Sequence, residues 1–174
     1  MNAILKLRPA HADDEPFLRE LRGQLDAERL GLQYWSPEQL ELARQVIDHQ
    51  FKAHDAHYRR VKSQRDTKDC VIELGGQVAG RFIVTQDVKE VYLADITVHR
   101  DHRGKGLGRA VIDAIKAECT QSKRVLRLHV DVSNPALQFY AQLGFRVIEQ
   151  QPMYNLMEWT PPTAPGKPVY FSPT

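Results

Sequence analysis

Apolar and polar residues follow two different periods along this chain, and the period changes near residue 70. Between residues 13 and 59, apolar side chains recur three or four positions apart, which predicts two amphipathic helices. After residue 70, short stretches of alternating apolar and polar residues predict strands, and Pro9 is expected to end an earlier strand. The predicted strands cover residues 4–8, 70–74, 78–85, 91–98, 125–132, 145–148 and 153–159. The predicted helices cover residues 13–30, 36–59, 106–121 and 135–143.

Residues that favour helix starts and tight turns agree with these boundaries. Asp13 and Asp14 can cap the first helix, and Ser36 with Gln39 forms a capping-box pattern at the second. Gly75-Gly76 predicts a hairpin turn. The order of elements is strand, two helices, three strands, helix, strand, helix and two strands. This order predicts a mixed α/β chain with an antiparallel meander and disfavours a doubly wound sheet.

Size and composition suit one globular domain. The chain has 174 residues, which is a common size for a single domain. Its 24 Lys and Arg residues nearly balance 22 Asp and Glu residues, and the net charge of +2 argues against a dedicated nucleic-acid binder. No uncharged apolar run approaches the ~20 residues that span a bilayer, so we expect no membrane partner. Cys70 and Cys119 form no disulfide framework or metal-ligand spacing, and we expect them to be core residues of a cytoplasmic protein.

Prolines are concentrated at the end of the chain. Five of the ten prolines fall within the last fourteen residues. A Pro-rich segment favours extended structure over a packed core. We therefore expect a domain over residues 1–160 and a tail over residues 161–174.

The strongest local signal is a glycine-rich segment between a predicted strand and a predicted helix, Arg103-Gly104-Lys105-Gly106-Leu107-Gly108. Glycines let the backbone approach a ligand closely. A helix N-terminus offers unpaired N–H groups and a partial positive charge. Arg100 and Arg109 add cationic side chains on either side. Together these features predict an anion site, with a pyrophosphate as the preferred ligand.

Two other phosphate-binding motifs do not fit this segment. A Walker loop needs Ser or Thr after Gly-Lys, whereas Gly106 follows Lys105. A dinucleotide fingerprint needs a third glycine where Arg109 stands. A tight strand-to-helix turn that binds no ligand is the remaining alternative from the glycines alone.

The segment from Val98 to Gly108 resembles the central motif of the GNAT superfamily of N-acetyltransferases, Gln/Arg-x-x-Gly-x-Gly/Ala after a strand. Arg100 stands where the family usually has proline. The family's second motif is resembled by Asn134-Pro135-Ala136, Phe139-Tyr140 and Leu143-Gly144-Phe145, and the resemblance covers residues 3–160. It implies an α/β (α+β) fold with a mixed, mostly antiparallel central sheet of about seven strands, flanked by about four helices and splayed at the acetyl-CoA site.

The resemblance also implies which residues hold acetyl-CoA, the co-substrate. Backbone groups of the strand before the loop would hold the pantetheine arm and the thioester, and N–H groups of the loop would hold the pyrophosphate. Asn134 would approach the pantetheine, and Tyr140 would lie near the sulfur. The residues implied at this site are Ile96, Val98, His99, Arg103, Gly104, Lys105, Gly106, Leu107, Gly108, Arg109, Asn134 and Tyr140.

Three side chains are candidates for proton transfer. Tyr140 could protonate the departing thiolate as a general acid, although a packed aromatic side chain is the alternative. A primary amine with a pKa near ~10 is mostly protonated at pH 7, so a base or an anchor is needed. Asp95, acidic in an otherwise uncharged strand, is the first candidate, and His129, with an ordinary pKa of ~6.5, is the second. A structural carboxylate and a half-buried histidine are equally open interpretations of these two.

These features predict an N-acetyltransferase that transfers the acetyl group of acetyl-CoA to a primary amine by direct attack in a ternary complex. The expected acceptor is a small-molecule or peptide amine, and we expect a monomer or homodimer. Tyr34 and Trp35 could line the acceptor site or plug the edge of the core. His54 and His57 lack a nearby third ligand, so no metal is expected. The alternatives are a non-catalytic acyl-CoA-binding sensor or structural module, and a nucleic-acid binder that uses the basic loop.

Overall fold

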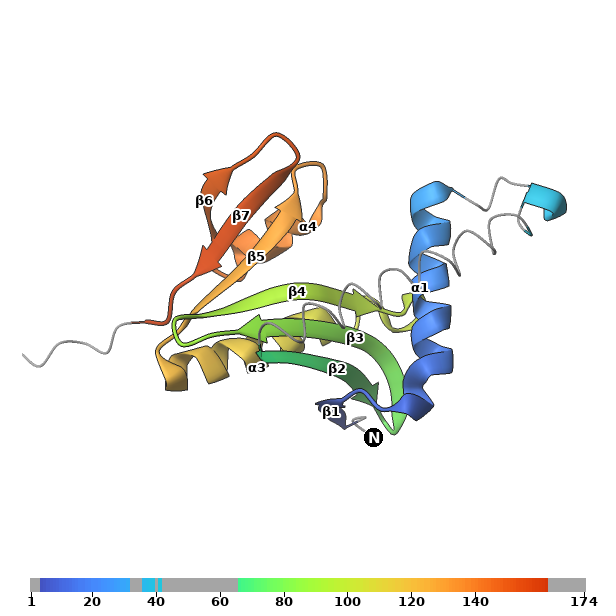
Figure 1. Cartoon of the computed structure of the whole chain (residues 1–174), viewed down its shortest axis with the longest axis horizontal. Helices are drawn as coiled ribbons and strands as arrows, with labels where there is room; N and C mark the ends of the chain where they lie inside the picture. The colour runs from blue at the N-terminus through green and yellow to red at the C-terminus, as the bar shows by residue number, and fades with distance from the viewer. Residues whose placement is uncertain (1–3, 32–35, 40, 42–65, 163–174) are drawn as a thin grey trace, which may run out of the picture.

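One seven-stranded sheet organises the molecule, in the order β1-β2-β3-β4-β5-β7-β6 (Figure 1). The computed structural model describes residues 4–31, 36–39, 41 and 66–162. The strands are β1 (Leu5–Pro9), β2 (Asp66–Leu74), β3 (Gln77–Gln86), β4 (Glu90–Val98), β5 (Val125–Asp131), β6 (Arg146–Gln150) and β7 (Tyr154–Trp159). Every neighbouring pair is antiparallel except β4 and β5, which are parallel. The expected mixed, mostly antiparallel sheet is therefore confirmed.

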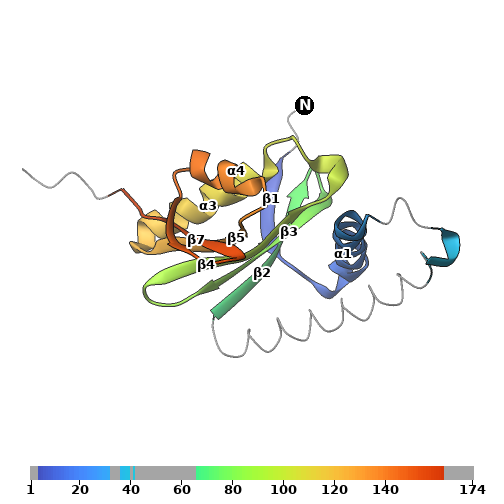
Figure 2. The same ribbon diagram turned by 90° about the horizontal axis from the view of Figure 1, so that it is seen from above.

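Helices cover both faces of the sheet. The helices α3 (Leu107–Ser122) and α4 (Ala136–Gln142) lie on one side, and α1 (Glu15–Leu30) lies on the other (Figure 2). Two 3-10 turns, η1 (Ala12–Asp14) and η3 (Arg100–His102), come just before α1 and just after β4. Within the described residues, no helix is both long and apolar enough to cross a membrane.

Only the start of the second predicted helix is described, and it has the expected capping box. The Ser36 N–H lies 2.8 Å from Oε1 of Gln39, and the Gln39 N–H lies 3.3 Å from Oγ of Ser36. Residues 37–39 and 41 are helical, and residues 42–59 lie outside the described residues.

The main core lies between the sheet and α3. Its buried side chains include Val91, Leu93, Val111, Ile112, Cys119, Leu126, Leu128 and Met157. Cys119 is fully buried, and this burial raises the pKa of its thiol to about 11. A buried thiol of this kind packs as a small apolar side chain and is chemically inert. Cys70 packs against the same core, so both cysteines are core residues as expected.

A β-bulge interrupts β4. Leu93 and Asp95 lie opposite consecutive residues of β3, which leaves Ala94 as an extra residue on β4. Leu93 belongs to the main core, and Ile96, three positions later, packs against the same core. Successive strand residues point to opposite faces, so the bulge resets the alternation and turns Asp95 away from this core.

The parallel strands β4 and β5 part directly after the bulge. They pair only over Glu90–Leu93 and Val125–Leu128, although β4 continues to Val98 and β5 continues to Asp131. The last residues of β4 consequently have a strand partner, β3, on one side only. This separation is the splay that the family resemblance implies.

Among the boundaries that differ from the sequence prediction, those of β2 and β1 have a clear physical reason. β2 begins at Asp66 rather than residue 70, because its polar first residues are held by pairing with β3 and not by burial. Pro9 is the last residue of β1 and pairs with Cys70, so it belongs to the strand. β1 lies at the edge of the sheet, where a residue without an N–H group is tolerated. The division into a domain over 1–160 and a tail over 161–174 stays a prediction, because residues 163–174 lie outside the described residues.

Candidate active site

The glycine-rich loop leaves β4 and leads into α3. Gly104 and Gly106 have φ angles of 74° and 76°, in the left-handed region that suits glycine. A Cβ atom on either residue would meet no atom within 4 Å, so the outer side of the loop is open. The first N–H groups of α3 have no partner within the helix and carry the positive end of its dipole. With Lys105 and Arg109 exposed beside them, these groups fit a pyrophosphate.

A cavity of about 470 Å³ lies beside this loop, along the side of β4 that faces the splay. Five segments contribute its lining: Leu25 from α1; Ile96, Thr97 and Val98 from β4; Arg103 from the loop; Gly108 from α3; Ala136, Phe139 and Tyr140 from α4. A Cβ on Gly108 would lie 3.7 Å from Cζ of Phe139, so α3 begins in close contact with α4. The cavity therefore lies beside the open glycine loop and forms a mostly apolar slot that suits an extended, uncharged chain.

Tyr140 is one wall of this cavity. Its side chain is only 9% exposed, and its ring makes edge contacts with Phe139 and Phe145 at centroid distances of 5.3 and 5.7 Å. Burial, together with the negative charge of Asp95, raises the pKa of Tyr140 to about 12. The hydroxyl is therefore protonated throughout the neutral range and can donate a proton or a hydrogen bond into the slot.

Asp95 lies close enough to Tyr140 for its charge to act on that hydroxyl. Its carboxylate accepts a weak hydrogen bond from Oγ1 of Thr97, at 3.4 Å. Of the three predicted catalytic side chains, Tyr140 lines the cavity, and Asp95 acts on it through its charge. The bulge at Ala94 sets which face of β4 carries Asp95.

His129 lies apart from this pair, on the exposed face of β5. Its Nδ1 is 2.7 Å from the hydroxyl of Tyr92, which lies on β4 two positions before the bulge residue Ala94. The pKa of Tyr92 is raised because its hydroxyl is partly buried. Tyr92 is not among the residues predicted from the sequence, since only the pairing of β4 with β5 shows that these two side chains meet.

Two residues implied at the acetyl-CoA site make internal contacts. His99 donates its N–H to Ala79 O at 2.9 Å, accepts from His102 at its own carbonyl, and lines a neighbouring cavity against α1. Asn134 accepts the N–H of Ala136 at its Oδ1, 2.9 Å away, and so caps the start of α4. The roles of His99 and Asn134 toward acetyl-CoA stay predictions.

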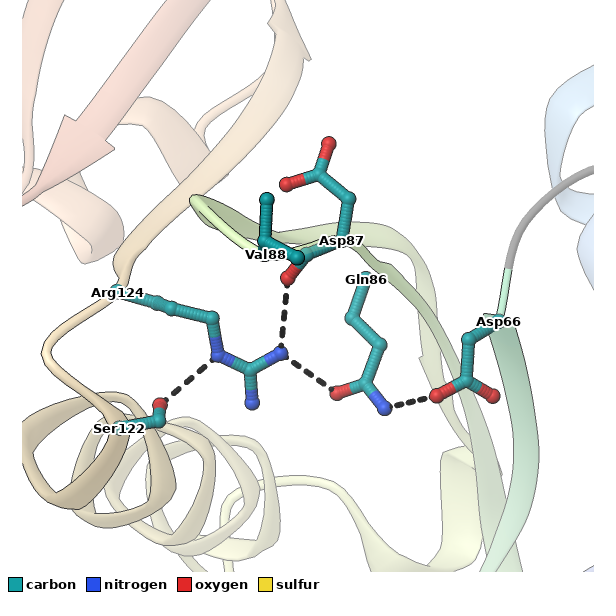
Figure 3. A pocket seen from close by; sticks show the side chains of 6 residues that line it. All are labelled: Asp66, Gln86, Asp87, Val88, Ser122 and Arg124. Atoms are coloured by element: carbon teal, nitrogen blue, oxygen red, sulfur yellow. Dashed lines mark hydrogen bonds between the residues drawn. The ribbon is translucent and has the colours of Figure 1, made fainter.

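A second cavity, of about 460 Å³, lies at the β3–β4 turn, away from the splay (Figure 3). Arg124 dominates it and donates to Oγ of Ser122 at 2.9 Å, Oε1 of Gln86 at 3.1 Å and the carbonyl of Asp87 at 3.2 Å. Its remaining nitrogen donates to Glu118. Arg124 therefore ties the end of α3 to the β3–β4 turn, and its donors are used in that structural contact.

Some predicted residues cannot be placed. Tyr34, Trp35, His54 and His57 lie outside the described residues. Within the part of the chain that the structure describes, no group of three His, Cys, Asp or Glu side chains could hold a metal ion.

Comparison with known proteins places this architecture. A family model for the acetyltransferase (GNAT) domain matches residues 32–161. The glucosamine 6-phosphate N-acetyltransferase of Trypanosoma brucei brucei is 37% identical over 65 residues, which are 37% of this chain. That match spans 44% of the enzyme, less than half of its length.

Two solved structures resemble nearly the whole chain. The PaiA N-acetyltransferase of Thermoplasma acidophilum, in complex with coenzyme A, has a TM-score of 0.66 at 17% identity, covering 90% of this chain and 99% of that one. The ribosomal-protein-S18-alanine N-acetyltransferase of Escherichia coli has a TM-score of 0.63 at 19% identity, covering 97% and 100%. At such identities these two structures establish the fold. The family model covers well over half of the sequence, including the loop and α4, and the chain therefore belongs to the GNAT acetyltransferase family.

Proposed function

We propose that this protein is an N-acetyltransferase that transfers the acetyl group of acetyl-CoA to a primary amine by direct attack in a ternary complex. The observation that carries the proposal is the cavity lined by Ile96, Thr97 and Val98 of β4, by Arg103 and Gly108 at the two ends of the glycine loop, and by Tyr140. Its volume of about 470 Å³ suits a small-molecule ligand.

Binding would use backbone groups more than side chains. The loop from Gly104 and the first turn of α3 would hold the pyrophosphate by N–H groups, with Lys105 and Arg109 adding charge. The unpaired side of β4 at Ile96 and Val98 would hold the pantetheine arm as an extra strand would. Relatives that bind coenzyme A with this fold support this placement.

The reaction forms a C–N bond and breaks a C–S bond. The neutral amine attacks the thioester carbonyl carbon, the C–S electron pair goes to sulfur, and the leaving thiolate is stabilised by the hydroxyl of Tyr140. Full proton transfer to a thiolate of ordinary pKa, ~8.5, is uphill from a hydroxyl whose pKa is about 12. Tyr140 therefore acts chiefly by donating a hydrogen bond, and it releases its proton only as the proton from the amine returns to the site.

The amine must lose a proton, and we propose two groups that could take it. The charge of Asp95 acts on Tyr140, and its carboxylate can also anchor a protonated amine before attack. The Tyr92–His129 pair lies where β4 and β5 begin to part, and the imidazole of His129 is the second candidate acceptor. For the acceptor we propose a small-molecule or peptide amine. The names of the relatives support both classes, glucosamine 6-phosphate and an alanine of ribosomal protein S18.

The test is release of free thiol from acetyl-CoA with a panel of amines and peptide N-termini. Tyr140→Phe removes the hydroxyl and keeps the ring, so turnover should fall by about 100-fold. Coenzyme A affinity, measured by calorimetry on the same variant, should stay unchanged because the phosphate loop is intact. Equal turnover in both proteins would remove Tyr140 from the mechanism. No thiol release with any amine, despite coenzyme A binding, would favour a non-catalytic binding protein.

A further inference from the structure

The side chain of Arg103 crosses from the glycine loop to α1. Its Nε donates to the carbonyl of Val98 at 3.1 Å, and its Nη2 donates to Oε2 of Glu28 at 3.0 Å. Glu28 is 75 residues away in the sequence and lies in the last turn of α1. Arg103 thus joins three parts of the site: the loop, the free end of β4 and the helix on the other face.

The Val98 carbonyl is the key acceptor in this arrangement. Val98 and Arg103 both line the cavity beside the splay. In the proposed function, that carbonyl is one of the groups that the amide N–H donors of the pantetheine arm would use. The guanidinium of Arg103 and the incoming arm therefore compete for the same oxygen.

Glu28 holds Arg103 in the competing position. Burial alone would raise the pKa of Glu28, but hydrogen bonds from Arg103 and Gln24 outweigh it and lower that pKa. The carboxylate is therefore ionised at neutral pH and pairs with the guanidinium. Both side chains are more than 40% exposed, at 44% and 42%, so the contact can open without unpacking the core.

We propose that the Arg103–Glu28 pair is a latch that occupies the acyl-CoA slot and that acyl-CoA must open in order to bind. This inference rests on the proposed function and concerns regulation of the same site. When the latch opens, the Val98 carbonyl becomes available to the pantetheine arm. The guanidinium then turns from Glu28 to the pyrophosphate, which it can bind by two parallel hydrogen bonds.

The latch predicts that one substitution near the site tightens coenzyme A binding instead of weakening it. Glu28→Gln weakens the hold on Arg103, increases the fraction of open molecules and so tightens coenzyme A binding. Exposed ion pairs contribute only modestly to stability, so the dissociation constant should fall about two- to fivefold. Titration calorimetry of the full chain with coenzyme A measures this change, and circular dichroism verifies folding of each variant.

Two controls separate a latch from a general charge effect, because loss of any carboxylate near the loop favours an anionic ligand. In an Arg103→Ala background, Glu28→Gln should leave the dissociation constant unchanged, since there is no guanidinium to release. Asp101→Asn removes a carboxylate that is 71% exposed and lies beside Arg100 on the same loop, and it should tighten binding less than Glu28→Gln does.

Each other result overturns the proposal in a distinguishable way. An unchanged or higher dissociation constant in Glu28→Gln, with coenzyme A bound normally by the unaltered chain, would reject the latch alone. A second contrary result is that Glu28→Gln tightens coenzyme A binding equally with and without Arg103, or that Asp101→Asn tightens it as much as Glu28→Gln does. Either result would show a general charge effect and would also reject the latch. If the unaltered chain binds no coenzyme A, the proposed function itself fails, and the latch fails with it.

Discussion

Tyr140 illustrates how surroundings set the chemistry of one side chain. Its backbone carbonyl accepts the N–H groups of Leu143 and Phe145, which fixes the end of α4, and its ring is enclosed by aromatic neighbours. Burial and the charge of Asp95 together keep the hydroxyl protonated. A tyrosine on an exposed helix would have neither the fixed direction nor the raised pKa.

Gly106 is the residue on which the anion-binding loop depends most directly. In the ligand-free chain, a larger side chain would meet no neighbour, but a φ of 76° strains a β-branched residue. Gly106→Val should therefore weaken coenzyme A binding by more than about tenfold, or ~1.4 kcal/mol, because the loop N–H groups move and the side chain enters the phosphate site.

The matched control for this substitution is Gly76→Val. Gly76 has a φ of 86° and equally open surroundings, but it lies in the β2–β3 hairpin turn. Both variants should lose about 1–3 kcal/mol of stability through backbone strain, and only Gly106→Val should lose affinity in calorimetry. Loss of affinity in both would indicate a global effect and not a phosphate site.

At the scale of elements, the contact between β3 and β4 positions the slot. The bulge at Ala94 and the parting from β5 leave β3 as the strand partner that holds the end of β4. On the far side of α4, Lys116 of α3 donates to the Leu143 carbonyl and lies over the rings of Phe145 and Trp159, 5.5 and 5.1 Å from their centroids. These contacts hold the two walls of the cavity in place.

Gly80 of β3 tests how close this contact must be. A Cβ there would lie 2.5 Å from the carbonyl of Thr97 and 3.2 Å from Cα of Val98. Gly80→Ala must therefore push β3 away from the end of β4, and it should lower the free energy of unfolding by about 1–3 kcal/mol. Urea denaturation measures the change.

Gly23→Ala in α1 is the matched control, because a Cβ on Gly23 would meet no atom within 4 Å. Within a helix this substitution should stabilise the protein by about 0.5–1 kcal/mol. If Gly80→Ala were as stable as the unaltered chain, the close approach of β3 and β4 would not be needed.

At the scale of the whole molecule, Arg8 connects β1 and the turn before α1 to β2, which lies far from both in the sequence. This β1 residue donates to both carboxylate oxygens of Asp14 at 2.8 Å and to Glu73 of β2 at 2.9 Å. Asp14 also accepts the N–H of His11 at 2.8 Å, and it is only 6% exposed. The network fixes where α1 leaves the sheet, and α1 in turn forms one wall of the cavity through Leu25.

This network makes stability depend on acid pH. The hydrogen bonds from Arg8 lower the pKa of Asp14 from 3.8 to about 2. A lowered carboxyl pKa contributes stability that is fully present above pH ~4 and is lost as the pH falls through about 2. The free energy of unfolding should therefore fall across this window, and Asp14→Asn should flatten that part of the profile.

Near neutral pH, Asp14→Asn should cost about 1–2 kcal/mol in urea denaturation, since it weakens charge-assisted hydrogen bonds at a buried position. Glu15→Gln is the control, because the Glu15–Arg19 pair is 61% and 50% exposed. This exposed pair should contribute less than about 0.5 kcal/mol. An unchanged acid profile in Asp14→Asn would show that other carboxyl groups control acid unfolding.

Much of the fold was predictable from local pattern. The alternation of Val125–Val132 and the helical spacing of residues 106–121 each report which face of an element is buried. The start of β2 was missed because Asp66–Asp69 are polar, and their strand conformation comes from pairing with β3. The glycine loop could be read from sequence because few residues other than glycine accept its backbone angles.

The sequence by itself determined the class of elements, the glycine-rich loop and the family, since these depend on local backbone preferences and on residue spacing. Tertiary structure alone decided the register. It placed the bulge at Ala94, paired Tyr92 with His129 and put Arg103 against Glu28. These contacts join residues far apart in the chain, and a shift of one position in a strand reverses the face of every side chain that follows.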